Sequence, residues 1–250
     1  MSLVQLEDRG SVVLVKLSRP EKLNALNLEL RQELLKTLRD FNSDQSKRVA
    51  ILSGEGRAFS VGADLGSISS DLTEDLRASF YPILREIRFA QKIYIAAING
   101  VTAGAGISLS LACDVRLASP SSKFVTAFHS IGLAPDTGLT LILTRLGGTR
   151  FLDRLLLGGE MSAQDLEREG VVKVVDDPLS EAIKIAEQIS SGPFKSYVAS
   201  KKLINRALFP DLEEFLDYES ALQGYLGSTA DFNEGVKAFI EKRKPSFRGE

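Results

Sequence analysis

An α/β fold with a helical C-terminal part is the fold class that the sequence predicts. Short apolar or β-branched runs alternate with helical patterns in the first half of the chain, and helical patterns dominate from residue 136 onward. No linker, low-complexity segment or short repeat interrupts the 250 residues, of which 44% are apolar. We therefore predict one domain, with a core over residues 1–195 and a helical extension of the same domain over residues 196–250.

The expected elements follow from the spacing of apolar residues. Residues 11–18 (SVVLVKLS) form a β-branched run bounded by Gly10 and Pro20, which predicts a strand. Residues 27–42 repeat apolar side chains at helical spacing, and Asn27 is a plausible N-cap. The further predicted strands are 48–53, 93–99, 115–118, 123–126 and 171–175. The further predicted helices are 72–90, 107–113, 138–146, 148–157, 162–169, 180–191, 195–208, 212–226 and 231–242.

Composition excludes several functional classes. The chain has 31 basic and 33 acidic residues, a net charge of −2, so there is no basic excess of the kind that nucleic-acid binders carry. One cysteine, Cys113, and one histidine, His129, leave no disulfide and no multi-cysteine or multi-histidine metal site. No apolar run is long enough to span a membrane, and the N-terminus lacks the pattern of a secretory signal. We expect a cytoplasmic protein without a metal, a nucleic-acid partner or a membrane partner.

Two glycine-rich segments follow buried apolar runs. The first is Gly62–Leu65 after AILSG, and the second is Gly100–Gly106 after IAAIN, at the start of a helix. Glycine lets a ligand approach the backbone closely, and the first N–H groups of a helix have no acceptor within it. Two such segments could each supply one N–H group to an oxyanion. The alternative is that both are plain strand-to-helix turns.

Six segments together resemble the crotonase, or enoyl-CoA hydratase/isomerase, superfamily. They lie in the order and spacing of that family and span nearly the whole chain: SRPEKLNAL (18–26), GRAFSVGADL (56–65), AAINGVTAGAGISLSLACDVRLAS (96–119), KFVTAFHSIGLAPDTG (123–138), GGEMSAQDLEREGVVKVVDD (158–177) and FNEGVKAFIEKRKPSF (232–247). The resemblance implies a spiral of ββα turns with a C-terminal helical trimerisation region, assembled as trimers or dimers of trimers. It also implies an acyl-CoA thioester substrate, with coenzyme A as part of the substrate and no separate cofactor.

In family members, backbone N–H groups of the two glycine segments hold the thioester oxygen as an enolate forms. Carried over, these are the N–H groups of Ala63 and Ala105. The family's hydratases also use two glutamates, and this sequence has Ser108 and Phe128 at those positions. Neither residue can act as a carboxylate base, which argues against ordinary enoyl-CoA hydration.

One other acidic position matches the family. The ring-modifying branch of phenylacetate degradation carries an acid/base aspartate in a G-L-x-P-D segment, which here is Gly132–Asp136. The resemblance makes Asp136 the catalytic residue of an isomerase that shifts a double bond or rearranges a ring epoxide. Apolar neighbours could raise its pKa by desolvation. From the local sequence alone, Asp136 is instead a helix N-cap before the run LTLILTRL.

Further residues are implied as substrate contacts. They are Lys22, Leu23, Ala25, Val61, Asp64, Leu65, Phe128 and Lys242, with Phe239 beside Lys242 as a contact that could reach a neighbouring subunit's coenzyme A. His129 is a weaker acid/base candidate, and Asp114 is interpreted as structural. Two alternatives to the isomerase remain: an enoyl-CoA hydratase with atypical residues, and a non-catalytic acyl-CoA-binding or RNA-binding protein.

Overall fold

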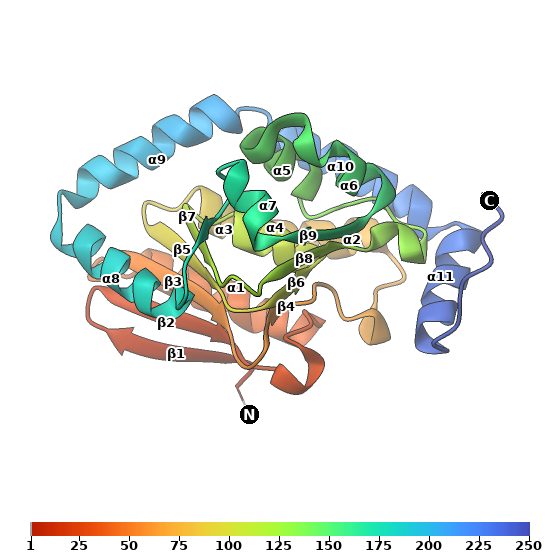
Figure 1. Ribbon diagram of the computed structural model, residues 1–250, viewed down its shortest axis with the longest axis horizontal. Coiled ribbons are helices and arrows are strands. Elements are labelled where there is room, and N and C mark those ends of the chain that lie inside the picture. The colour runs from red at the N-terminus through yellow and green to blue at the C-terminus, as the bar shows by residue number, and fades with distance from the viewer. Residues whose placement is uncertain (1) are drawn as a thin grey trace.

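Two β-sheets organise the chain in the computed structural model, which describes residues 2–250 (Figure 1). The larger sheet has the order β1-β2-β3-β5-β7-β10, and the smaller has the order β4-β6-β8-β9. Among the strands of the described residues, only the β1–β2 and β8–β9 pairs are antiparallel. The strands of the larger sheet are β1 (Val4–Arg9), β2 (Val12–Leu17), β3 (Val49–Gly54), β5 (Ile93–Ile98), β7 (Val115–Ala118) and β10 (Lys173–Val174). Those of the smaller sheet are β4 (Ala58–Ser60), β6 (Val101–Ala103), β8 (Lys123–Thr126) and β9 (Gly159–Ser162).

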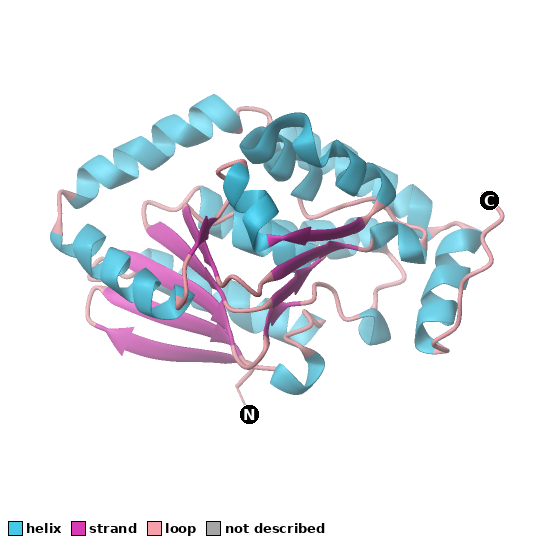
Figure 2. Cartoon of the chain, viewed as in Figure 1, coloured by secondary structure: helices cyan, strands magenta, loops and turns pink. Residues whose placement is uncertain are grey.

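Three successive turns of the chain each add one strand to each sheet before a helix follows, whereas β1 and β2 both belong to the larger sheet; Figure 2 shows the strands in magenta and the helices in cyan. The pair β3–β4 leads into α2 and α3, the pair β5–β6 leads into α4, and β7–β8 leads into α5. This is the expected spiral of ββα turns. The helices are α1 (Leu28–Ser43), α2 (Leu72–Asp75), α3 (Tyr81–Arg88), α4 (Ala105–Leu111), α5 (Leu139–Gly147), α6 (Leu152–Leu157), α7 (Ala163–Arg168), α8 (Pro178–Ser191), α9 (Phe194–Leu208), α10 (Leu212–Gly227) and α11 (Ala230–Ile240).

The two faces of the larger sheet bury separate apolar clusters. Alternating residues of β2 point to opposite faces, so Val13 and Val15 join the main core while Val12 and Leu14 pack toward α8. The main core lies between the larger sheet and α1, α3 and α4. Because β3 and β5 are covered on both faces, every residue in them is buried, which is why they read as continuous apolar runs.

The structure differs from the predicted elements mainly in short strands. β4 and β6 lie where the sequence predicted glycine-rich loops, and neither β1 nor β9 was predicted. These strands are short or polar, and pairing across the fold stabilises them rather than local propensity. The second glycine segment therefore contains β6 between its glycines and is not a direct strand-to-helix turn. The predicted strand 171–175 shortens to β10, which pairs with β7 at the end of the larger sheet.

Most predicted helices are present within a residue or two. Asn27 is the N-cap of α1, with its side chain accepting a hydrogen bond from Leu30 N. The predicted helix 72–90 is a continuous helical segment, but residues 76–80 form a π-helical stretch between α2 and α3. The predicted helix 148–157 divides into a 3₁₀ turn (Gly148–Phe151) and α6. Residue 195, the predicted end of the core, lies in the first turn of α9. The division into a core and a helical extension stays a prediction.

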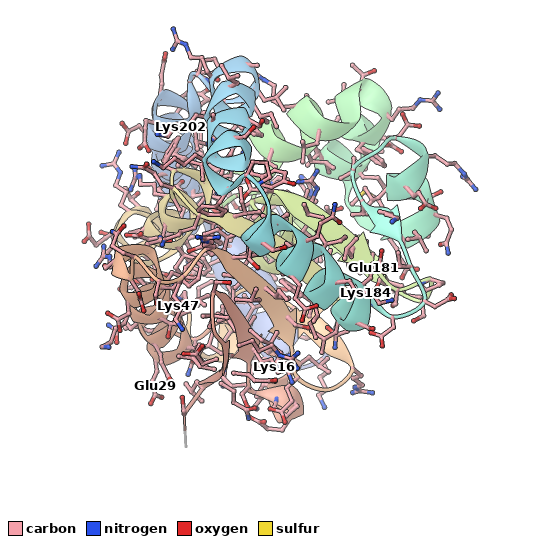
Figure 3. All side chains as sticks on the ribbon, turned by 90° about the vertical axis from the view of Figure 1, so that its left-hand side faces the viewer. Lys16, Glu29, Lys47, Glu181, Lys184 and Lys202 are labelled. Carbon is pink, nitrogen blue, oxygen red and sulfur yellow. The ribbon has the colours of Figure 1, made fainter. Side chains whose placement is uncertain are left out.

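Exposed side chains differ between two surfaces. Figure 3 shows charged side chains of both signs around α8, including Lys16, Lys184 and Glu181. By contrast, α6, α9 and α10 expose large apolar side chains: Leu152, Leu156, Leu157, Leu203, Ile204, Tyr218, Leu222 and Tyr225. None of the helices in residues 2–250 has the length and hydropathy that a membrane span requires.

Candidate active site

A cavity of about 550 Å³ opens where the two glycine segments meet the helices after β4. Its volume is within the usual range for a small-molecule site. Most of its lining is apolar, and its polar side chains come from different elements. The lining residues are Lys22, Ala25, Val61, Ala63, Asp64, Leu65, Gly66, Ile68, Leu72, Asp75, Leu76, Phe80, Ala103, Gly104, Ala105, Ala127, Phe128, Ser130, Ile131, Leu133, Asp136, Phe239 and Ile240.

The two glycine segments touch each other at Gly62. Its φ of 82° lies in the left-handed region, and a Cβ at this position would lie 2.7 Å from Ala103 O and 3.0 Å from Ala105 N. Any larger residue would force the segments apart. Glycine at position 62 therefore brings the backbone around Ala63 next to the first turn of α4.

Two backbone amides at this junction have no acceptor. Within residues 2–250, neither Ala63 N nor Ala105 N donates a hydrogen bond to another protein atom. Ala105 is the first residue of α4, where the helix itself offers no acceptor. Both residues line the cavity. The arrangement can supply two N–H donors to a bound oxygen.

Asp136 lies on the same cavity, in the segment that leads into α5. The helix begins at Leu139, and its N-cap is Gly138 rather than Asp136. The N-cap interpretation of Asp136 is therefore wrong: its backbone carbonyl accepts from Leu139 N, while its side chain points elsewhere. The next residue, Thr137, has φ 55°, a conformation that a β-branched residue rarely adopts. The backbone beside Asp136 is thus held in a strained shape.

The Asp136 carboxylate has neutral hydrogen-bond donors. Gln223 Nε2 donates to Oδ2 at 2.7 Å, and Thr137 Oγ1 donates to Oδ1 at 3.0 Å. Burial raises the pKa of Asp136 to about 6, although these two hydrogen bonds oppose the shift. This is the direction of shift that desolvation by apolar neighbours is expected to give. Phe128, Ile131 and Leu133 share the cavity with Asp136, whereas Leu139 is buried away from it.

Two side chains of α10 accept hydrogen bonds from the backbone of the segment that contains Asp136. Gln223 Oε1 accepts from Ala134 N at 3.2 Å, and Glu219 Oε1 accepts from Gly138 N at 2.9 Å and from the Tyr81 hydroxyl at 3.0 Å. Burial first, and then the charge of Asp136, raise the pKa of Glu219 to about 8. Glu219 therefore holds its proton to a higher pH than Asp136 does.

The two positions that carry glutamate in hydratases are filled differently here. Phe128 lines the cavity with an apolar ring. Ser108 is fully buried, and its hydroxyl donates to the Asp136 backbone carbonyl at 3.3 Å. Neither position places an ionisable group on the cavity.

Six of the eight predicted substrate contacts line the cavity: Lys22, Ala25, Val61, Asp64, Leu65 and Phe128. Asp64 is paired with Arg19 at 3.1 Å. Leu23 and Lys242 are not among the lining residues; the Leu23 carbonyl accepts from Val61 N, and Lys242 is exposed after α11. Phe239 lines the cavity of its own chain. The binding roles of these residues remain predictions.

The remaining sequence candidates lie off the cavity. His129 is not among the lining residues, although its neighbours Phe128 and Ser130 are. Asp114 accepts from Tyr94 N at 2.9 Å and pairs with Lys201 at 2.8 Å, which agrees with a structural role. Burial raises the pKa of the Cys113 thiol to about 12. In residues 2–250, no three His, Cys, Asp or Glu side chains group together in a way that could hold a metal ion.

Sequence reasoning missed three polar residues of the site, Gln223, Glu219 and Asp75. The signal that could have found them is a polar residue on an apolar helix face. Glu219 and Gln223 continue the buried stripe of Leu212 and Leu216 on α10. Such positions are costly unless the polar group has a partner, so they mark candidate functional or network residues.

The ββα spiral, with two free backbone amides and one desolvated carboxylate on a shared cavity, places the molecule in the crotonase superfamily. The chain belongs to the enoyl-CoA hydratase/isomerase family, whose sequence model matches residues 7–250. It is 38% identical over 249 residues to the 1,2-epoxyphenylacetyl-CoA isomerase of Escherichia coli (strain K12), with 95% of each chain covered. This likeness confirms the resemblance to the ring-epoxide isomerase branch.

Other relatives have different names. The chain is 37% identical over 253 residues to a probable enoyl-CoA hydratase of Rhodobacter capsulatus, with 98% of each chain covered. Its fold matches the crystal structure of an enoyl-CoA hydratase from Mycobacterium avium subsp. paratuberculosis K-10 with a TM-score of 0.91, at 29% identity and 99% coverage of both chains. The family is therefore shared by proteins named as isomerases and as hydratases.

Proposed function

We propose that this chain is an acyl-CoA isomerase that works through an enolate. The Ala63 and Ala105 amides hold the thioester oxygen, and Asp136 removes a proton from a carbon beside or vinylogous to the carbonyl. The electron pair of the broken C–H bond moves onto the oxygen. The proton on Asp136 exchanges with solvent while the enolate exists, and Asp136 then delivers a proton to another carbon. Double-bond migration is the simplest outcome, and rearrangement of a ring epoxide is the second. Coenzyme A enters as part of the substrate, and the chemistry calls for no separate cofactor.

One observation carries this proposal: a carboxylate with a pKa raised to about 6 shares a cavity with two unpaired amide donors. Each oxyanion donor contributes roughly 3–4 kcal/mol to lowering the barrier. A base whose pKa lies near neutrality is both ionised and strong enough to take a carbon-bound proton. The isomerase named in Escherichia coli adds support from similarity.

A hydratase is the second candidate, because the Rhodobacter capsulatus relative is named a probable enoyl-CoA hydratase. Addition of water requires the α-carbon to be protonated and a hydroxyl to be delivered to the β-carbon. Ser108 and Phe128 cannot share those tasks, which favours the isomerase. A non-catalytic acyl-CoA-binding protein is the third reading.

A panel of acyl-CoA thioesters in D2O separates these functions. We expect deuterium at a carbon that exchanges in the enolate, together with a product of unchanged mass apart from the label. Gain of one water, seen as loss of absorbance from the conjugated enoyl group, would establish the hydratase. Tight binding without any deuterium uptake would establish a binding protein and refute the isomerase.

Residues at the cavity mouth are proposed to hold the coenzyme A portion. Lys22 is exposed at the cavity, and Ala25, Val61 and Leu65 continue the same wall. A lysine ammonium beside the opening suits the negative phosphates of coenzyme A. Leu23 and Lys242, which do not line this cavity, would contact only the outer part of the ligand or a neighbouring subunit.

Self-association into trimers or dimers of trimers is proposed for the apolar surface of α6, α9 and α10. Leu156, Leu157 and Leu203 are each more than 70% exposed, which is unusual for side chains of this size on a monomer. Light scattering is expected to give a mass of three or six chains. A monomer at micromolar concentration would refute the assembly.

A further inference from the structure

A second carboxylate lines the cavity, on an element that the proposed mechanism does not use. Asp75 is the last residue of α2, and Leu72, Leu76 and Phe80 on the same helical segment also line the cavity. The three apolar residues form a wall for an acyl group. Asp75 interrupts this wall with an ionisable side chain.

The Asp75 carboxylate is held at one oxygen only. Arg31 donates to Oδ1 at 2.8 Å, and the Ser79 hydroxyl lies 3.1 Å from the same atom. The Arg31 side chain is only 4% exposed, behind the cavity wall, and its guanidinium lies 4.2 Å from the centre of the Phe80 ring. Within residues 2–250, Oδ2 of Asp75 accepts no hydrogen bond. This side chain is 13% exposed, and Asp75 belongs to the cavity wall.

A carboxylate oxygen in an apolar cavity is stabilised by a hydrogen-bond donor, and a plain alkyl chain offers none. Arg31 already balances the charge of Asp75, so a second cation would leave an uncompensated positive charge in the cavity. A neutral donor suits the free oxygen best. Among neutral donors on an acyl chain, a hydroxyl group is the smallest and donates in any rotation about its C–O bond.

We propose that Asp75 is a specificity-determining residue that accepts a hydrogen bond from a hydroxyl group on the acyl part of the thioester. The inference rests on the proposed acyl-CoA function and names its substrate class as hydroxylated acyl groups. Arg31 and Ser79 are positioning residues, because they hold Asp75 without lining the cavity. A site built to bond a substrate hydroxyl discriminates strongly against the analogue that lacks it.

Binding of unreactive ligands tests the inference separately from catalysis. Calorimetry would compare hexanoyl-CoA with derivatives that carry one hydroxyl on each of the three outer carbons. A hydrogen bond to a charged group contributes about 1.5–3 kcal/mol, so one derivative should bind about 10–100-fold more tightly than hexanoyl-CoA. In Asp75→Asn the amide oxygen can still accept from Arg31, which leaves an NH2 group toward the cavity. That NH2 group can still donate to a hydroxyl oxygen, but a hydrogen bond between two neutral groups is weaker than one to a carboxylate, so the affinity ratio is expected to fall several-fold below the wild-type ratio.

Asp71→Asn is the matched control. Asp71 is exposed, caps α2 through a hydrogen bond from Glu74 N and lies outside this cavity. Asparagine caps as well as aspartate does, so this variant removes a charge from the same helix and should keep the wild-type ratio. Thermal unfolding of both variants checks that they fold.

Each outcome has a separate meaning. Equal affinity of the wild type for plain and hydroxylated chains would refute the specificity inference alone. An Asp75→Asn variant that keeps the wild-type ratio would refute it as well. Failure to bind any acyl-CoA would refute the proposed function and this inference together. Asp136→Asn should keep the hydroxyl preference while it loses deuterium exchange, which keeps the two proposals distinct.

Discussion

Two partly buried aspartates with opposite surroundings show how one fold uses the same side chain in two ways. Asp114 pairs with Lys201 at 2.8 Å and lies 3.5 Å from Arg88, beneath α9 and away from the cavity. Asp136 has no cation within salt-bridge distance among the described residues, and its partners are an amide and a hydroxyl. The first aspartate ties helices to a strand, and the second remains available for chemistry.

The difference lies in what compensates each charge. A buried ion pair resists removal of either partner, because the other charge is left without compensation. A buried carboxylate with only neutral donors is less well compensated, and its pKa rises as a consequence. The ion pair therefore gives Asp114 a structural role, whereas the lack of a cation makes the Asp136 carboxylate more basic.

The largest expected effect comes from Asp136→Asn. Loss of the base should slow deuterium exchange by about 10²–10⁴-fold, while acyl-CoA binding persists. The folded-state pKa of Asp136 lies above its ordinary value of 3.8, so the wild type loses stability as pH rises from about 4 to about 6. The variant lacks that loss and should be more stable at pH 7, by up to about 3 kcal/mol. Full exchange activity in this variant would exclude the mechanism.

Asp114→Asn makes the same chemical change at the other aspartate, but we expect it to lower the free energy of unfolding rather than raise it. Lys201 and Arg88 would remain buried without their carboxylate, so the free energy of unfolding should fall by about 3–5 kcal/mol. Urea denaturation of the wild type and the two variants measures both changes in the free energy of unfolding. Stabilisation by Asp114→Asn, or destabilisation by Asp136→Asn, would contradict the comparison.

A smaller effect is expected from Gln223→Met, which keeps the shape of the side chain and removes its donor. Without that hydrogen bond the pKa of Asp136 should rise further above 6, and exchange at pH 6 should fall about 10-fold. Gln188→Met is the matched control, since Gln188 is exposed on α8 far from the cavity lining. If the exchange rate fell by the same factor at every pH, with no shift in its apparent pKa, Gln223 would have only a packing role.

The smallest change in activity at pH 7 is expected from Glu219→Gln. Glu219 has a raised pKa that favours its protonated form, which glutamine resembles, so we expect glutamine to replace it with little loss. The folded-state pKa of Glu219 lies above its ordinary 4.5, and the wild type therefore loses stability as pH rises toward 8. The variant should lack this fall, so its stability advantage should grow with pH. A difference that stays constant from pH 5 to pH 9 would show that Glu219 does not titrate in this range.

Much of the fold could be predicted because its strongest signals are local. The buried strands β3 and β5 are continuous apolar runs, and α1 begins at a recognisable cap. β9 could not be predicted, because it contains Gly159 and Glu160 and exists only through its antiparallel pairing with β8. Pairing of this kind depends on contacts between segments far apart in the chain.

The residues of the candidate site also fall into two groups, those that a local motif predicts and those that only the structure brings together. The glycine segments and Asp136 belong to short motifs that can be recognised without a structure. Gln223, Glu219 and Asp75 act on the site from positions more than 50 residues away from Asp136, and no local pattern links them to it. Only the packing of α10 and α2 around the cavity makes those three residues part of one arrangement.

The pH dependence of deuterium exchange tests the central claim most directly. The rate constant for exchange of an acyl-CoA thioester should rise through an apparent pKa of about 6, as Asp136 loses its proton. Asp136→Asn should show no such limb. A limb near the ordinary pKa of aspartate, or one of wild-type height in Asp136→Asn, would contradict the assignment of Asp136 as the desolvated base.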